Sequence, residues 1–428
     1  MSAVHEHHLP NGMTLLCFHQ PQLHGVELGL YLKGGTLYES RANQGICHLL
    51  EHLCFRGLGG IGHEELNVMQ SRMGFDLEGA TYPEGVVFRA AALARCGEAL
   101  VKLFVRFFAD VPWTQEQIDI EKQVVLRQIE EEDADFEEEV DRRYRRTAAG
   151  AFPLMGTAQS VTDMSPALIR RWQRMLFQPQ NACLCISGEF SKGLEAVAIA
   201  TFSALENHTD EPPFVQAQPI GFCMRDSRSD FVRDEEGGHA KVHIAFDIDS
   251  DQVFPLVSHV LNAYTGANTD SILFQTLREE EAMVAEIESY IEELGEFRRL
   301  VIRYDVRQEL LADSLRRVFS LLCRLRMYVR PVRLELTRTE FTDNHDLMLD
   351  STAAMNELMG WGWLANDPSR SDMDASAKMY DDLTIDDMLV AAQSIFRPEN
   401  LTISIQRDPA QTPRSLRPLL TELRAMLD

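Results

Sequence analysis

The strongest constraint on the fold of this chain is a five-residue pattern that occurs once in each half of the sequence. Residues 177–181 read FQPQN and residues 396–400 read FRPEN, so both follow F-x-P-x-N. Each copy is followed directly by an apolar run, ACLCISG or LTISIQ, which is typical of a buried β-strand. The same pattern in front of the same kind of element indicates two tandem copies of one folding unit.

Hydrophobic patterns and turn residues predict that this unit mixes helices with strands. In the first half we expect strands at 13–18, 26–32, 85–94 and 182–188 and helices at 43–58, 63–73, 97–146, 165–176 and 192–205. In the second half we expect strands at 239–248, 299–306 and 401–406 and helices at 255–263 and 271–281. The first two runs predict a hairpin. Pro112 predicts a break in the long helix, and Thr114 is expected to cap its second part.

We therefore predict an α+β fold with two tandem homologous lobes. Each lobe is expected to be a mainly antiparallel sheet backed by helices, and the two lobes are expected to enclose a cavity. The N-terminal lobe is expected at 1–207 and the C-terminal lobe at 221–428. Residues 208–220 are predicted to be a linker, because they combine several prolines with polar residues.

The charge balance of the chain argues against several classes of partner. The formal net charge is −25. Nucleic-acid binding needs clustered Lys and Arg, and an acidic surface is repelled by anionic membranes, so we expect neither as a partner. The acidic surface either attracts basic peptides or only keeps the protein in solution.

The expected location of the chain is the cytoplasm. No run of eighteen apolar residues predicts a transmembrane helix, and the N-terminus lacks the basic start and apolar run of a signal peptide. The eight cysteines include no C-x-x-C pair, which is typical of reduced and mostly buried thiols.

The sequence HLLEH at 48–52 is the strongest chemical signal. A helix places His48 and His52 one turn apart on one face, with Glu51 beside them. Two imidazoles at this spacing can hold one zinc ion, and the carboxylate can accept a proton from a water on that ion. The order H-x-x-E-H is the inverse of the commoner zinc-peptidase motif. Two histidines on an apolar helix can also be structural, so the motif alone leaves both interpretations open.

The residues around this motif resemble the pitrilysin, insulinase and mitochondrial-processing-peptidase family, the M16 peptidases. Residues that match the family pattern precede and follow the histidines: Gly35, Glu39, Asn43, Gly45, His48, Glu51, His52, Phe55 and Gly57. LPNGMTLL resembles the first strand of the family, QIDIEKQVVLRQI its helix with the third metal ligand, and SILFQTLREEE its S-x-L-F-x-x-L-R-E segment. The resemblance covers nearly the whole chain.

The resemblance implies a zinc ion held by His48, His52 and a third ligand, with Glu51 as the general base. The family's third ligand is a glutamate seven residues after the glutamate that opens its helix motif. Glu121 opens the motif here, so the third position holds Gln128. A neutral carbonyl should bind zinc more weakly than a carboxylate.

Three nearby acids are alternatives for completing the zinc site. Glu121 is either such a ligand or an acceptor that orients a ligand histidine. Glu131 and Glu132 are either substitute ligands or part of a solvated acidic surface.

The second half departs from the family at its substrate-binding residues. Family members use an Arg and a Tyr, seven residues apart, to hold the substrate and polarise its carbonyl. Arg278 matches the Arg, but Ala285 stands at the Tyr position and Tyr290 is out of register. Arg278 either keeps the family role or pairs with a neighbouring glutamate. The segment around Ala80 and Thr81 is expected either as a sheet edge that receives the substrate backbone or as an ordinary core strand.

Two functions are compatible with this pattern. In the first, the chain is a zinc-dependent endopeptidase for short or unstructured peptides, and a homologous subunit supplies the Arg and Tyr in a heterodimer or homodimer. In the second, the chain is a non-catalytic scaffold of the same fold with a weakened metal site. The complete His48, Glu51 and His52 favour the first function, whereas Gln128 favours the second.

Overall fold

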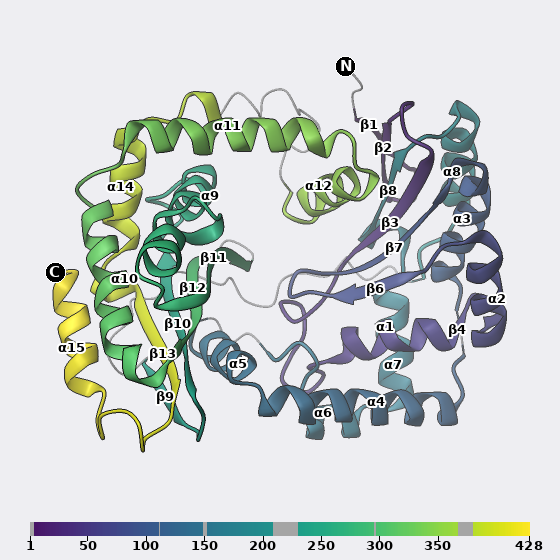
Figure 1. Ribbon diagram of the computed structural model, residues 1–428. Helices are drawn as coiled ribbons and strands as arrows, with labels where there is room; N and C mark the ends of the chain where they lie inside the picture. Colours follow the sequence, from purple (N-terminus) through teal and green to yellow (C-terminus); the bar gives the residue numbers. More distant parts are fainter. Residues whose placement is uncertain (1–3, 111, 149–151, 209–229, 295–296, 367–379) are drawn as a thin grey trace. The chain divides into compact units, whose positions relative to one another are not determined.

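The computed structural model describes residues 4–110, 112–148, 152–208, 230–294, 297–366 and 380–428 (Figure 1). The chain divides into two compact units by its contacts. Unit 1 comprises 1–134, 150–218 and 344–376, and unit 2 comprises 135–149, 219–343 and 377–428. Each unit therefore contains a segment from the other half of the chain. All but the first residue of the predicted linker lies outside the described residues, so the domain boundary stays a prediction.

Unit 1 is built on a six-stranded sheet with the order β1-β2-β8-β3-β7-β6. Its strands are β1 (His5–His8), β2 (Thr14–His19), β3 (Gly25–Lys33), β6 (Glu78–Thr81), β7 (Gly85–Leu93) and β8 (Ala182–Gly188). All neighbours pair antiparallel except β2 and β8, which are parallel. The predicted hairpin of β2 with β3 is wrong, because β8 lies between them. Every residue of β8 is buried, and a strand buried on both faces belongs inside a sheet.

Helices cover both faces of the unit 1 sheet. They are α1 (Ile46–Arg56), α2 (His63–Met73), α3 (Gly97–Phe104), α4 (Gln115–Ala134), α6 (Ala158–Asp163), α7 (Pro166–Leu176), α8 (Lys192–Ser203) and α12 (Thr352–Leu364). Short strands β4 (Gly57–Leu58) and β5 (Ile61–Gly62) follow α1. The predicted long helix is broken as expected near Pro112, where α3 and the 3₁₀ turn Val105–Phe108 end before α4 begins.

Unit 2 is built on a five-stranded sheet with the order β11-β12-β10-β13-β9. Its strands are β9 (Phe231–Asp234), β10 (His239–Ile248), β11 (Val284–Leu294), β12 (Phe297–Arg307) and β13 (Leu401–Arg407). Its helices are α5 (Phe136–Ala148), α9 (Pro255–Asn262), α10 (Leu311–Leu325), α11 (Pro331–Met348), α14 (Ile385–Ile395) and α15 (Arg417–Met426), together with the π-helical turns η4 (Ala263–Ala267) and η5 (Phe274–Glu280). Helices α10 and α14 cover one face of the sheet, and α5 lies against the other face (Figure 1).

The two sheets repeat one topology. Strands β2, β3, β6, β7 and β8 have the same neighbours, in the same directions, as β9, β10, β11, β12 and β13. In both sheets the last strand in the chain pairs parallel with the first strand of the series, and the other pairs are antiparallel. The structure thus confirms the predicted α+β fold with two similar, mainly antiparallel sheets backed by helices.

The F-x-P-x-N pattern has the same structural role in both copies. The phenylalanine follows the last residue of a helix, α7 or α14, and the proline starts a 3₁₀ turn. The asparagine side chain then donates a hydrogen bond back to a carbonyl at the end of that helix. Asn181 Nδ2 lies 3.0 Å from the carbonyl oxygen of Leu176, and Asn400 Nδ2 lies 3.0 Å from that of Ile395. This bond satisfies a carbonyl that would lack an intrahelical partner.

The helices exchanged between the halves dock in different ways. In unit 1, Met355 and Met359 of α12 pack on Tyr31 and Cys183, which lie on an apolar sheet face. In unit 2, α5 docks mainly through charge. Its acids Glu137 and Asp141 pair with Arg303 and Arg299 on β12, and its Tyr144 hydroxyl donates to Asp247 on β10.

Two further predictions concern membrane spans and cysteines. Within the described ranges, every helix is too short or too polar to span a membrane. Seven of the cysteines lie in these ranges, and all seven are free thiols.

A buried histidine on the charged face of the unit 2 sheet predicts acid sensitivity. Burial and the nearby Arg299 lower the pKa of His243 to about 3. The pKa of this histidine in the unfolded chain is about 6.5. As the pH falls below that value, the histidine becomes protonated in the unfolded chain but stays neutral in the folded chain, so the folded state loses stability. We expect His243→Leu to remove about 2 kcal/mol of the stability loss between pH 7 and pH 5. Urea unfolding at both pH values measures this difference, and an equal pH dependence in both proteins would contradict it.

Candidate metal centre

The helix that carries the HLLEH sequence is fixed at its N-terminus by a buried acid. The Glu39 carboxylate accepts hydrogen bonds from the backbone N–H groups of Gly45 (2.7 Å) and Cys47 (3.0 Å). Burial raises the pKa of Glu39 to about 7, against the effect of these two bonds. Gly45 has φ of 85°, and a Cβ there would lie 2.3 Å from the carbonyl oxygen of Met155. Glycine is therefore required where α1 begins.

The side chains of His48, Glu51 and His52 lie together on α1. The two imidazole rings are 4.6 Å apart between centroids and edge to face. The Glu51 Oε2 atom lies 3.6 Å from His48 Nδ1. All three side chains are largely buried. The arrangement matches the prediction that one turn of helix brings the two histidines and the acid together.

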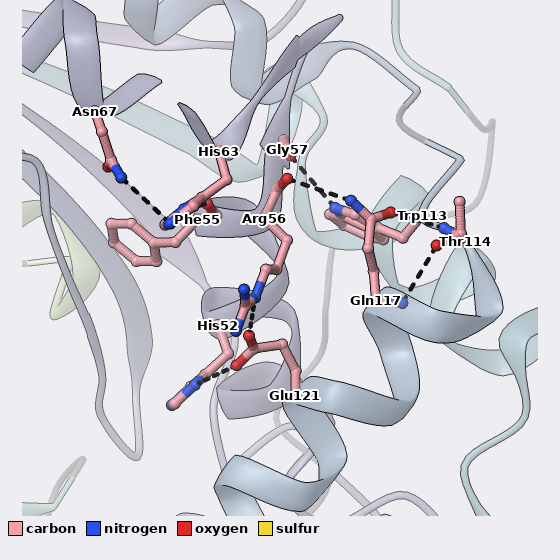
Figure 2. Close-up of polar contacts among 10 residues, drawn as sticks. All are labelled: His52, Phe55, Arg56, Gly57, His63, Asn67, Trp113, Thr114, Gln117 and Glu121. Carbon is pink, nitrogen blue, oxygen red and sulfur yellow. Dashed lines mark hydrogen bonds and ion pairs between the residues drawn. The ribbon is translucent and has the colours of Figure 1, made fainter. Parts of the chain in front are cut away.

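Helix α4 supplies the side chains that face these histidines. It begins at Gln115, and the Thr114 hydroxyl accepts a hydrogen bond from the Gln117 N–H, so the predicted N-cap is confirmed (Figure 2). The Gln128 Oε1 atom lies 3.3 Å from His48 Nε2. Glu121 lies nearly two turns earlier on the same helix and contacts His52. Both residues that the family resemblance singled out on this helix, Gln128 and Glu121, therefore contact the histidines of the motif.

Glu121 joins His52 to Arg56. Its Oε2 atom lies 3.0 Å from His52 Nδ1, and its Oε1 atom accepts from Arg56 Nε (Figure 2). Burial opposes the charge on this carboxylate, but His52 and Arg56 outweigh burial and lower the pKa of Glu121. This bond fixes the orientation of the His52 ring and leaves Nε2 as the nitrogen that can bind a metal.

Strand β6 holds the other side of Glu51. The Thr81 hydroxyl donates a 2.7 Å hydrogen bond to Glu51 Oε2. Burial opposes ionisation of Glu51, but His48 and Thr81 outweigh burial and lower its pKa. A Cβ on Gly79 would lie 3.1 Å from Glu51 Cγ, so this strand passes directly beside the carboxylate. Ala80 and Thr81 lie on β6, which is the outermost strand of the unit 1 sheet.

The donor set fits a metal ion with neutral ligands. Two donors that each lie about 2.0–2.1 Å from a tetrahedral ion are roughly 3.3–3.4 Å apart. The separation of His48 Nε2 and Gln128 Oε1 is 3.3 Å, which agrees with this geometry. Among the described residues, no group of three His, Cys, Asp or Glu side chains could hold a metal. Among the described side chains, the amide oxygen of Gln128 is the further donor that lies beside His48 Nε2.

A cavity of about 340 Å³ adjoins the motif. Its lining comes from α1, α2 and α4: Glu51, His52, Phe55, Arg56, His63 and Glu121. The His63 ring contacts the Phe55 carbonyl through Nδ1 at 3.0 Å, and Asn67 lies 3.2 Å from its Nε2 (Figure 2). This second histidine–amide pair was not anticipated from the sequence.

The residues predicted from the second half of the sequence belong to unit 2. The Arg278 guanidinium lies 3.2 Å from Glu279 and packs over the Phe274 ring. Ala285 is exposed at the start of β11, and the Tyr290 ring packs against Arg303.

The two remaining alternative acids lie at the end of α4. Glu131 is exposed, so its side chain lies at the surface of that helix. The side chain of Glu132 lies outside the described part of the chain. Of the acids on α4 that were considered from the sequence, Glu121 is the one whose side chain is seen to contact the motif.

Two interactions of the site were missed from the sequence. Arg56 lies one turn after His52, and this spacing is the signal that could have placed both beside Glu121. Thr81 was expected as part of either a substrate-binding edge or a core strand, but its hydroxyl donates a hydrogen bond to the predicted base. The sequence offers no signal for that contact, because it joins residues 30 positions apart.

Comparison with known proteins identifies the family to which this chain is related. Residues 15–158 match the family model "Insulinase (Peptidase family M16)", and residues 163–340 match "Peptidase M16 inactive domain". An uncharacterized zinc protease of Rickettsia bellii is 23% identical over 82% of this chain and 85% of its own length. The mitochondrial-processing peptidase subunit beta of Blastocladiella emersonii is 28% identical over 51% of this chain and 48% of its own.

A solved structure supports the same assignment at the level of the fold. The crystal structure of a protease from Helicobacter pylori has a TM-score of 0.83 and 16% identity, and the match covers 95% of this chain and all of that chain. The two family models together account for most of residues 15–340, across both units. The relatives by sequence are named as peptidases or zinc proteases. The chain therefore belongs to peptidase family M16.

Proposed function

We propose that the chain is a zinc-dependent endopeptidase subunit whose metal ligands are His48, His52 and Gln128. The observation that carries this proposal is the 3.3 Å approach of Gln128 Oε1 to His48 Nε2, next to the carboxylate of Glu51. Catalytic zinc sites commonly use three protein ligands, and neutral sets such as three histidines are among them. The absence of charge on Gln128 is therefore compatible with catalysis, although it lowers the expected affinity.

A bound zinc ion supplies a Lewis acid and lowers the pKa of a water molecule. The protein side chains would perform the proton transfers. Glu51 accepts the proton of the attacking water and later passes it to the leaving amine. The Thr81 hydroxyl holds Oε2 of this carboxylate, and the lowered pKa keeps Glu51 ionised at neutral pH. Glu121 holds the ring of His52 through Nδ1.

We propose that the substrate is a short or unstructured peptide that adds to the edge of β6. This strand is outermost in the unit 1 sheet and lies beside Glu51. An extended peptide can pair with the free backbone groups of such an edge, so Ala80 and Thr81 are proposed contacts. A folded segment cannot present an extended backbone in this way, which favours unstructured substrates such as precursor or leader peptides.

We also propose that a homologous subunit completes the site. Arg278 remains, but Ala285 has no hydroxyl that could polarise a substrate carbonyl. The similar peptidase of Blastocladiella is named as a beta subunit, which supports a paired arrangement. The partner would carry both the Arg and the Tyr of the family, in a heterodimer or with a second copy in a homodimer.

The alternative is a non-catalytic scaffold of the same fold, and Gln128 is the observation that favours it. A scaffold needs no base, yet Glu51 is held by a hydrogen bond from Thr81 and lies 3.6 Å from His48 Nδ1. The metal content of the protein separates the two functions. About one zinc per purified chain favours the peptidase, and a chain that stays zinc-free in excess zinc favours the scaffold.

We expect Glu51→Gln to abolish peptide cleavage and to leave zinc bound, because Glu51 acts as a base and not as a ligand. Loss of a general base typically costs about 10²–10⁴-fold in rate. Cleavage of a quenched fluorescent peptide and zinc analysis measure the two effects. Glu131→Gln, an exposed change on α4, is the matched control and should keep activity. Loss of zinc from Glu51→Gln, or retained turnover, would contradict the assignment.

Gln128→Glu should tighten zinc binding about tenfold or more, since it adds a negative charge at ligand distance from a dication. Competition with a zinc-responsive dye at pH 8 measures the Kd. Gln123→Glu adds the same charge to an exposed position of α4 and should change the Kd little. An unchanged Kd in Gln128→Glu would mean that another acid, such as Glu121, already completes the site.

The isolated chain should cleave peptides slowly, and a homologous subunit that carries both Arg and Tyr should raise the rate at least tenfold. The reason is that one missing oxyanion donor typically costs about 10²–10³-fold. Rates of the separate and mixed subunits measure the effect, with a Tyr→Phe partner as control. Full activity of the isolated chain at high dilution would rule out the paired arrangement.

A further inference from the structure

A second cavity lies in unit 2, among the helices that cover its sheet. Its volume is about 130 Å³. One ordered water needs roughly 10–15 Å³ of such space, so the cavity has room for a small oxyanion such as a phosphate or carboxylate group. Four arginines line it, from α10, the following loop and α11: Arg317, Arg324, Arg330 and Arg333. Glu280 is the one acid in this lining, so the formal charge of the lining is +3.

This concentration of positive charge is unusual in a chain with a net charge of −25. Within the described part of the chain, Arg324, Arg330 and Arg333 form no ion pair with a carboxylate. Arg317 pairs with Glu281 at 2.6 Å through one terminal nitrogen, but its buried Nε has no hydrogen-bond partner among the described residues. A buried donor without a partner costs free energy unless a ligand or water accepts its hydrogen bond.

The backbone around the cavity is irregular in a way that often marks a binding site. Tyr264 lies in the π-helical turn η4, and Gln275, Thr276 and Glu280 lie in η5. Such turns are rare in proteins, and many of those that do occur lie at functional sites. The Tyr264 hydroxyl accepts a hydrogen bond from the Arg330 N–H at 2.9 Å. This bond fixes the loop that follows α10 against η4.

Apolar side chains stand exposed beside the arginines. Tyr328 lines the cavity and is 50% exposed, and its neighbour Met327 is 74% exposed. Val332, next to Arg333, is 75% exposed, and Leu336 follows it by one helical turn at 58%. Exposed apolar groups that rim a charged pocket are typical of a site for a ligand with an apolar part.

We propose that this cavity binds an oxyanion, a phosphoryl or carboxyl group, that is attached to an apolar body. The guanidinium groups provide planar, permanently charged donors that match the oxygens of either group. The apolar body lies against the Tyr328 ring and its neighbours. The site is formed by unit 2 alone and uses no residue of the proposed metal centre, so it is independent of the proposed peptidase function.

Calorimetric titration of the whole chain with phenyl phosphate, benzoate and inorganic phosphate tests the proposal. We expect one-to-one binding of phenyl phosphate or benzoate. The tighter of the two identifies the group as phosphoryl or carboxyl. Loss of a charged hydrogen bond costs about 1.5–3 kcal/mol, so Arg324→Ala and Arg333→Ala should each weaken binding roughly tenfold or more.

Arg316→Ala is the matched control. Arg316 precedes Arg317 on α10, but it is paired with Glu422 and does not line the cavity. Binding to this variant should be unchanged, and the unfolding temperature of each variant reports whether it is folded. No binding of any probe up to about 10 mM, or equal weakening by Arg316→Ala, would overturn the proposal. Inorganic phosphate that binds as tightly as phenyl phosphate would overturn the apolar part of it.

Discussion

The hydrogen bond from an asparagine amide to the end of the preceding helix fixes the start of an inner strand in each half of the chain. Asn181 and Asn400 make this bond at equivalent places, and neither side chain is exposed. The bond ends the helix and directs the chain into β8 or β13. These strands each pair with one neighbour in parallel and one in antiparallel direction. The remaining strands take their positions relative to them, so the repeated motif marks the point on which each sheet depends.

In each sheet, one face packs against a helix from the other half of the chain, and the two sheets hold that helix by different interactions. The unit 1 sheet presents Leu16, Tyr31 and Cys185 to α12, and burial of these apolar groups drives the contact. The unit 2 sheet presents Arg299 and Arg303 to α5. The carboxylates of α5 form ion pairs with these two arginines. Arg299 is almost completely buried, and breaking a buried ion pair by removing one partner leaves an uncompensated charge. Two copies of one topology have therefore acquired an apolar and an ionic way of holding a helix.

The candidate metal centre depends on pairs of side chains that hold one another in place. Glu39 fixes the start of α1, Glu121 holds His52 and Thr81 holds Glu51. Each of these partners hydrogen-bonds to a group that would otherwise be buried with unsatisfied polar atoms. Gln128 differs, because it offers an oxygen and no charge. The motif residues are thus held by charged and hydroxyl partners, while the oxygen that faces His48 Nε2 is neutral.

Several features were predictable from the sequence because they depend on local order. The spacing of His48 and His52 places them on one helical face, Thr114 caps the helix that follows Pro112, and the repeat predicts two similar α+β units. Each of these follows from the geometry of a few consecutive residues. The strand order could not be read in the same way. The predicted hairpin fails because β8, more than 140 residues after β3, pairs with both strands.

The tertiary structure decided which side chains complete the candidate sites. Thr81 reaches Glu51 because an edge strand passes beside α1. No pattern in the sequence predicts that this strand and this helix are neighbours. The four arginines of unit 2 look like ordinary surface charges in the sequence, and only the packing of α10 and α11 against two π-helical turns gathers them around one cavity. Local sequence determines periodicity and capping, since these involve neighbours along the chain. Contacts between distant residues depend on how whole elements pack, which the chain establishes only when it folds.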